Sequence, residues 1–142
     1  MILFTSDTKD LHAKMQKTGF IYLFVSLFCV LFGAVYEYFS HEVYSYFMIY
    51  AFVIPQAGGM LPFFGMAYLK GPLPGRVSLN LYHSGIASLT VGCLFKGVLD
   101  IYGTTNRLIS VYWIVGAVLL ILGIAGYLLG ISCANTRSSF RK

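Results

Sequence analysis

The chain alternates long uncharged or nearly uncharged runs with short polar segments. Four such runs cover about residues 18–40, 43–69, 78–101 and 108–132. Each run reaches the roughly 20 residues that a helix needs to span the hydrocarbon core of a bilayer. A spanning segment must satisfy its own backbone hydrogen bonds, and segments of this length do so as helices. The residue-by-residue alternation of a transmembrane β-barrel is absent. The pattern therefore predicts an all-α membrane protein with four transmembrane helices.

Composition supports the same class of protein. Of the 142 residues, 58% are hydrophobic and only 11% are charged, whereas a soluble domain carries roughly 25% charged residues. The three cysteines, Cys29, Cys93 and Cys133, form no CxxC pair and no cluster with histidine. Phosphate-binding, hydrolase and zinc-protease motifs are also absent. We therefore predict no catalytic residue, no metal site and no cofactor, and do not expect an enzyme.

Basic residues are concentrated at one side of the predicted bundle. The positive-inside rule places that side in the cytoplasm, so both termini are expected there, most simply in a plasma (inner) membrane protein. The net charge of +5 is then a topology signal with some attraction to anionic lipid, and no nucleic-acid partner is expected. Eight of the ten basic residues lie on this side: Lys9, Lys14, Lys17, Lys70, Arg76, Arg137, Arg141 and Lys142.

The predicted organisation has three parts. Residues 1–17 form a cytoplasmic N-terminal segment, residues 18–132 form the transmembrane domain, and residues 133–142 form a basic cytoplasmic tail. The lipid bilayer is the first expected partner. Further copies of this chain, or another membrane protein, are the second.

Small residues recur every seven positions in each predicted span. Such a seam stays on one helix face when the helices supercoil slightly to the left, and small residues allow membrane helices to approach closely. The pattern favours a left-handed four-helix bundle. The seams are Gly19, Ser26, Gly33 and Ser40; Ala51, Gly58 and Gly65; Ser78, Gly85 and Gly92; and Gly116, Gly123 and Gly130.

The second span contains the sequence VIPQAGGMLPFFG at residues 53–65. Proline removes a backbone donor and kinks a membrane helix, so the helix is expected to break around Pro55, Gly58, Gly59 and Pro62. One interpretation is a packed kink, with Gly58 on the seam and Gln56 hydrogen-bonded across the bundle. The other is a substrate site, because transporters expose backbone groups to substrates at broken helices near the bilayer midplane.

A weak internal repeat relates residues 31–40, LFGAVYEYFS, to residues 94–103, LFKGVLDIYG. The two copies would belong to parallel αα-hairpin repeats, and Glu37 would occupy the position of Asp100. Lys96 lies one helical turn before Asp100, as Glu37 lies before His41. We expect these four side chains to meet at the external mouth, where they could form an ion or proton path. The alternative is a set of solvated helix ends.

His83 is a further ionisable candidate, in LYHSG of the third span. An intramembrane histidine could ligate haem or hydrogen-bond a quinone. A bis-histidine haem would need a second histidine at the same depth, which only another copy of the chain could supply. A hydrogen-bonded structural histidine is the alternative.

Three classes of function are consistent with these features. The first is a small transporter or channel-type bundle, or a subunit of one. The second is an accessory subunit that docks another membrane protein. The third is a haem or quinone redox anchor that uses His83.

Overall fold

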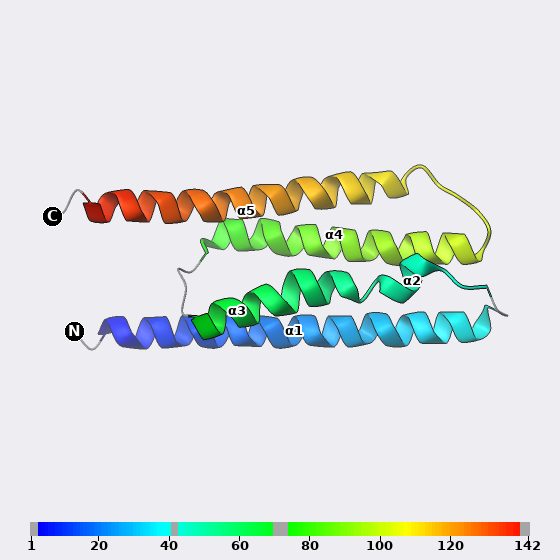
Figure 1. Cartoon of the computed structure of the whole chain (residues 1–142), viewed down its shortest axis with the longest axis horizontal. Helices are drawn as coiled ribbons and strands as arrows, with labels where there is room; N and C mark the ends of the chain where they lie inside the picture. Colours follow the sequence, from blue (N-terminus) through cyan, green and yellow to red (C-terminus); the bar gives the residue numbers. More distant parts are fainter. Residues whose placement is uncertain (1–2, 41–42, 70–73, 140–142) are drawn as a thin grey trace.

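The described residues, 3–40, 43–69 and 74–139 of a computed structural model, form helices joined by short connections, without strands (Figure 1). The prediction of an all-α four-helix bundle is confirmed. The second of the four long helical segments is built from three shorter pieces. The elements are α1 (Leu3–Phe39), α2 (Tyr46–Tyr50), the π-helix η1 (Ile54–Met60), α3 (Leu61–Leu69), α4 (Arg76–Ile101) and α5 (Ile109–Ser139).

Four segments are long and apolar enough to cross a bilayer: His12–Phe39, Tyr46–Leu69, Arg76–Ile101 and Ile109–Cys133. They agree with the four uncharged runs of the sequence to within a few residues at most ends. The first helix begins earlier, at Leu3, and continues into the first span without a break. The protein is therefore a small multi-pass membrane protein.

The helices are arranged so that the broken second span lies between α1 and α4 (Figure 1). α1 and α4 run parallel, and both described chain ends lie at the same end of the bundle. α5 packs mainly along α4, whereas α1 packs on η1 and α3. The second span thus joins α1 to the α4–α5 pair, and its conformation sets how they face one another.

Glycine permits the close approach of α4 and α5. A Cβ atom on Gly85 would lie 2.8 Å from the Leu120 backbone nitrogen and 3.0 Å from the Gly116 carbonyl oxygen. A Cβ atom on Gly123 would lie 2.9 Å from the backbone nitrogen of Tyr82. These glycines belong to the seams predicted for the third and fourth spans. The two seams therefore face each other, and backbone packing replaces the hydrophobic driving force that helices lack in lipid.

The seam of α1 faces the second span in the same way. A Cβ atom on Gly19 would lie 3.1 Å from the Phe64 ring, and one on Gly33 would lie 3.4 Å from the Met48 carbonyl oxygen. The seams are not used along their whole length, because a Cβ atom on Gly65 would meet nothing within 4 Å.

Local hydrogen bonds end α4 and precede α5 in the connection between them. Gly103 has a φ of +69°, and its N–H bonds to the Asp100 carbonyl while that of Thr104 bonds to the Leu99 carbonyl. This pair of bonds is the glycine-dependent motif that ends helices. The Asn106 side chain then accepts the Leu108 N–H at 2.9 Å, ahead of α5.

We expect Gly85→Ala to destabilise the α4–α5 pair, because its methyl group would overlap backbone that cannot rotate away. Overpacking of this kind costs about 1–3 kcal/mol. Thermal unfolding in detergent would measure the loss. Gly130→Ala is the matched control, since a Cβ atom there meets nothing within 4 Å. Equal melting temperatures for the two variants would contradict the described packing.

The charge bias predicts that the helix ends bearing both termini are cytoplasmic. In a variant whose three native cysteines are replaced by alanine, a membrane-impermeant thiol reagent added to intact cells should label Asn106→Cys and spare Lys17→Cys. Permeabilised cells provide the control, because both positions should then react. Labelling of Lys17→Cys in intact cells would show that the orientation is the opposite of the predicted one.

Candidate functional site

The second span breaks where its prolines and paired glycines lie. Pro55 is the second residue of η1 and has no backbone N–H to donate. At the other end of this segment the Leu61 N–H bonds to the Gln56 carbonyl, five residues back, which is the π-helical spacing. Single π-helical turns inside membrane and soluble helices are common at functional sites, so the side chains around η1 define the candidate site.

The carbonyl of Gly58 accepts a hydrogen bond from another helix. In a regular α-helix its donor would be the N–H four residues on, but that residue is Pro62. The Tyr82 hydroxyl of α4 donates to this carbonyl at 2.6 Å. No water is present in the bilayer core to fill such a vacancy. The bond therefore satisfies the broken helix and ties it to α4.

Gly59, and not Gly58, is the glycine that close packing requires. A Cβ atom on Gly59 would overlap the ring of Tyr22 from α1. A Cβ atom on Gly58 would meet only Ile86, at an ordinary 3.6 Å. The assignment of Gly58 as the closely packed seam residue is therefore wrong at this position.

His83 lies in an aromatic stack at the same level. Its Nδ1 is 2.5 Å from the Tyr22 hydroxyl oxygen. Its ring is stacked on Phe63, with centroids 5.0 Å apart and an interplanar angle of 11°, and on Tyr22, with centroids 5.5 Å apart. Tyr22 and Phe63 are themselves stacked at 5.7 Å. Three separate helices thus contribute to one cluster.

The Tyr22–His83 pair retains one unused hydrogen-bond donor. A neutral histidine has one N–H and tyrosine has one O–H, and the bond between them consumes one of the two. If tyrosine donates to Nδ1, the proton of His83 is on Nε2; if histidine donates, the tyrosine O–H is free. Neither group bonds to another side chain in the described part of the protein. The pair can therefore donate to a ligand in either tautomer.

The pair lies on the wall of an apolar groove between α1 and α4, floored by Pro55 of η1. Its volume is about 530 Å³. Of the polar side chains that line the groove, Thr90 donates its hydroxyl to the Ile86 carbonyl of the same helix at 2.8 Å. The remaining lining side chains are Thr18, Ile21, Val25, Phe28, Cys29, Ala87, Val91 and Leu94.

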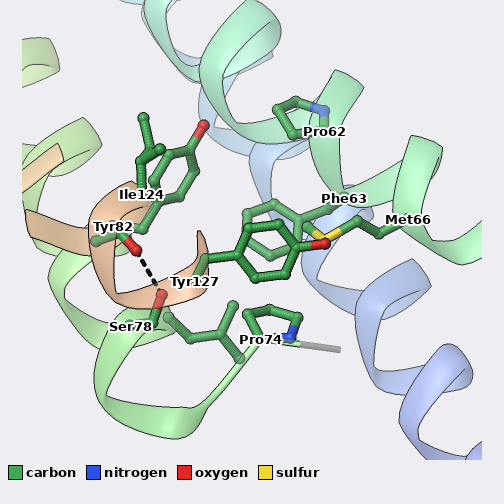
Figure 2. Close-up of a pocket in the computed structure, with 10 residues that line it drawn as sticks. Pro62, Phe63, Met66, Pro74, Ser78, Tyr82, Ile124 and Tyr127 are labelled. Atoms are coloured by element: carbon green, nitrogen blue, oxygen red, sulfur yellow. Dashed lines mark hydrogen bonds between the residues drawn. The ribbon is translucent and has the colours of Figure 1, made fainter. Parts of the chain in front are cut away.

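A second cavity, of about 250 Å³, lies on the other side of the aromatic cluster. Figure 2 shows the side chains of α3, α4 and α5 that converge on it. Phe63 and Tyr82 line this cavity, and Phe63 also stacks on His83, which lines the groove. These side chains therefore separate the two spaces. On the α4–α5 side, the Ser78 hydroxyl donates to the Gly123 carbonyl at 2.5 Å.

Three members of the predicted charged cluster, Glu37, Lys96 and Asp100, lie near the ends of α1 and α4 away from the termini, and they have separate surroundings. Lys96 pairs with Asp100 at 2.6 Å, as their spacing along one helix predicts. The Ser45 hydroxyl donates to the other Asp100 oxygen at 3.3 Å, and the Lys96 ammonium lies 5.7 Å from the centroid of the Phe47 ring. These contacts tie α4 to the start of the second span.

Glu37 bonds to neither Lys96 nor Asp100 within the described residues. It lines a separate cavity between α1 and α2, and its Oε1 is buried without a hydrogen-bond partner. His41, the fourth member of the predicted cluster, lies outside the described residues. Gln56 has an exposed side chain and lines neither the groove nor the cavity of Figure 2.

No three His, Cys, Asp or Glu side chains of the described residues gather in a way that could hold a metal ion. Of the cysteines, Cys29 and Cys93 are buried and Cys133 is exposed. No protein-family model, curated protein or solved structure matches the chain. The geometry of the aromatic cluster and its cavities is therefore the basis for a functional proposal.

Sequence reasoning selected His83 but missed Tyr22, Phe63 and Tyr82. A usable signal existed for Tyr22, because it lies between Gly19 and Ser26 at helical spacing and so shares the inner face of α1. No sequence pattern around Tyr22 indicates its contact with His83, which lies 61 positions away.

The two neighbouring glycines offer a sharp test of the cluster. Gly59→Ala should displace the Tyr22 ring, break its bond to His83 and lower thermal stability in detergent. Gly58→Ala should be tolerated, because its methyl group would form only ordinary contacts with Ile86. If Gly58→Ala proved the more damaging change, the described register of η1 would be wrong.

Proposed function

We propose that the protein binds a neutral, lipid-soluble molecule with a carbonyl-type acceptor, such as a quinone, in the groove between α1 and α4. It would act as a small transporter-type bundle or as a subunit of one. The observation that carries the proposal is the Tyr22–His83 pair, which keeps an unused donor on the wall of an apolar groove of about 530 Å³.

The lining of the groove selects the charge of the ligand. Burying an unpaired charge against apolar side chains costs far more than burying a neutral polar group. The side chains that line the groove include no acid, lysine or arginine to pair with such a charge. A neutral molecule whose single acceptor meets the free donor of the pair fits this surface.

The position of the groove favours entry from the lipid. α1 and α4 each pack on the second span more than on each other, so the space between them opens sideways. The ligand could partition into the bilayer first and then diffuse into the groove. The second cavity, across Phe63 and Tyr82, supports a transporter-type role because it offers a further space beyond the same aromatic cluster.

A quinone suits the cluster better than haem. Haem ligation by His83 would use Nε2, and a second axial ligand would have to come from another copy of the chain or another protein. A quinone carbonyl needs only the one donor that the pair already retains. A haem anchor would therefore require a second axial ligand that the groove does not provide.

The number of hydrogen-bond donors left in each variant predicts which variant weakens binding most. Tyr22→Phe and His83→Leu each leave one donor, so each should only weaken the preference for a carbonyl ligand. The double variant leaves none. We expect it to bind decylubiquinone about 3- to 20-fold more weakly, the range that corresponds to a membrane hydrogen bond of roughly 0.6–1.7 kcal/mol. Equilibrium binding in lipid nanodiscs would measure this.

The matched control is His12→Leu/Tyr68→Phe, which makes the same chemical changes outside the groove. Decylbenzene, which has no carbonyl, provides the ligand control and should bind the wild type and the double variant equally. A double variant that retained the full preference for decylubiquinone over decylbenzene would disprove the proposed site.

A further inference from the structure

Glu37 lines a cavity of about 220 Å³ between α1 and α2. The other walls are apolar and include Val30, Ala34, Met48 and Phe52. This space touches the groove described above only at Cys29, which lines both. It is therefore a separate site with a different chemical character.

The Oε1 atom of Glu37 is buried without any hydrogen-bond donor. Leaving a buried acceptor unsatisfied is destabilising, and more so when the group is charged. Native proteins contain few such atoms, and each requires an explanation. Glu37 itself lines the cavity, so a molecule that enters the cavity is the candidate donor for this carboxyl group.

Three side-chain donors at this end of the bundle bond to other groups. The Lys96 ammonium is paired with Asp100, and the Ser45 hydroxyl also donates to Asp100. The Ser40 hydroxyl bonds to backbone carbonyls, including that of Glu37 itself at 2.8 Å. Within the described residues, no donor reaches the Glu37 Oε1 atom.

The cavity also has the size and polarity of an amphipathic ligand site. A cavity of about 150 Å³ in a protein core can hold benzene, so this space is large enough for a phenyl ring with a short side chain. Glu37 lies near the end of α1, whose last residue is Phe39. A ligand would place its charged group there, close to the aqueous boundary, and its apolar part against Met48 and Phe52.

We propose that this cavity binds small hydrophobic molecules that carry a protonated amine, with the ammonium group donating to the Glu37 carboxylate. Charge-assisted hydrogen bonds of this kind are about twice as strong as neutral ones. The site is independent of the quinone-type site proposed above, since it shares neither its donor nor its charge preference.

The test compares 2-phenylethylammonium with 2-phenylethanol, which has nearly the same shape and no charge. Equilibrium dialysis at pH 7 would use the full chain in lipid nanodiscs, with protein-free nanodiscs as background. We expect the wild type to bind the ammonium at least about tenfold more tightly than the alcohol, which corresponds to about 1.4 kcal/mol. Glu37→Gln should remove this preference and bind the two molecules equally.

Asp10→Asn is the matched charge control, because Asp10 is exposed and distant from the cavity along α1. It should behave as the wild type. Ala34→Phe keeps the carboxylate but fills the space, and should lose both ligands while its thermal unfolding shows that it remains folded. Decylubiquinone binding to Glu37→Gln should be unchanged, which separates this site from the groove.

Three results would overturn the proposal. The wild type could show no preference for the ammonium, which would mean that no ammonium group pairs with Glu37. Glu37→Gln could retain the preference, which would place the ammonium elsewhere. A folded Ala34→Phe that still bound both ligands would show that the cavity is not the site.

Discussion

The absence of water in the bilayer core is the constraint on which the rest of this structure depends. Pro62 deprives the Gly58 carbonyl of its helical donor, and the Tyr82 hydroxyl replaces that donor from α4. The bond fixes the rotation of α4 against the second span. Because His83 is the next residue along α4, its ring is turned toward α1 and the groove. A backbone requirement thus positions the most chemically versatile side chain in the span.

Two kinds of glycine contact serve different purposes around this bond. Gly59 gives the Tyr22 ring room to lie on the backbone of η1, which completes the stack with Phe63 and His83. Gly85 instead brings the backbones of α4 and α5 together. The first contact shapes a binding surface, and the second attaches a helix that takes little part in that surface. The protein therefore joins a site-forming unit of three spans to a fourth span through backbone packing.

The uncharged runs predicted the four spans, and the prolines with the glycine pair marked the irregular segment. The seven-residue seam does not continue through that segment, for a physical reason. A seven-residue repeat assumes about 3.5 residues per turn, whereas the π-helical bonds of η1 place more residues in a turn. The face extrapolated to Gly58 consequently belongs to Gly59. Lys96 and Asp100 could be paired from their spacing alone, but the contact of Tyr22 with His83 depends on the packing of separate helices.

The bond between Tyr82 and Gly58 also bears on how the chain enters the membrane. As a ribosome delivers the spans in order, the second one emerges before the α4 hydroxyl that completes it has been synthesised. Until then its open carbonyl must find a donor at the protein-lined or hydrated edge of the insertion machinery, because lipid offers none. The second span and α4 would therefore be released into lipid together, as a hairpin. A proline at one position would thus tie the insertion of one span to a tyrosine translated 20 residues later.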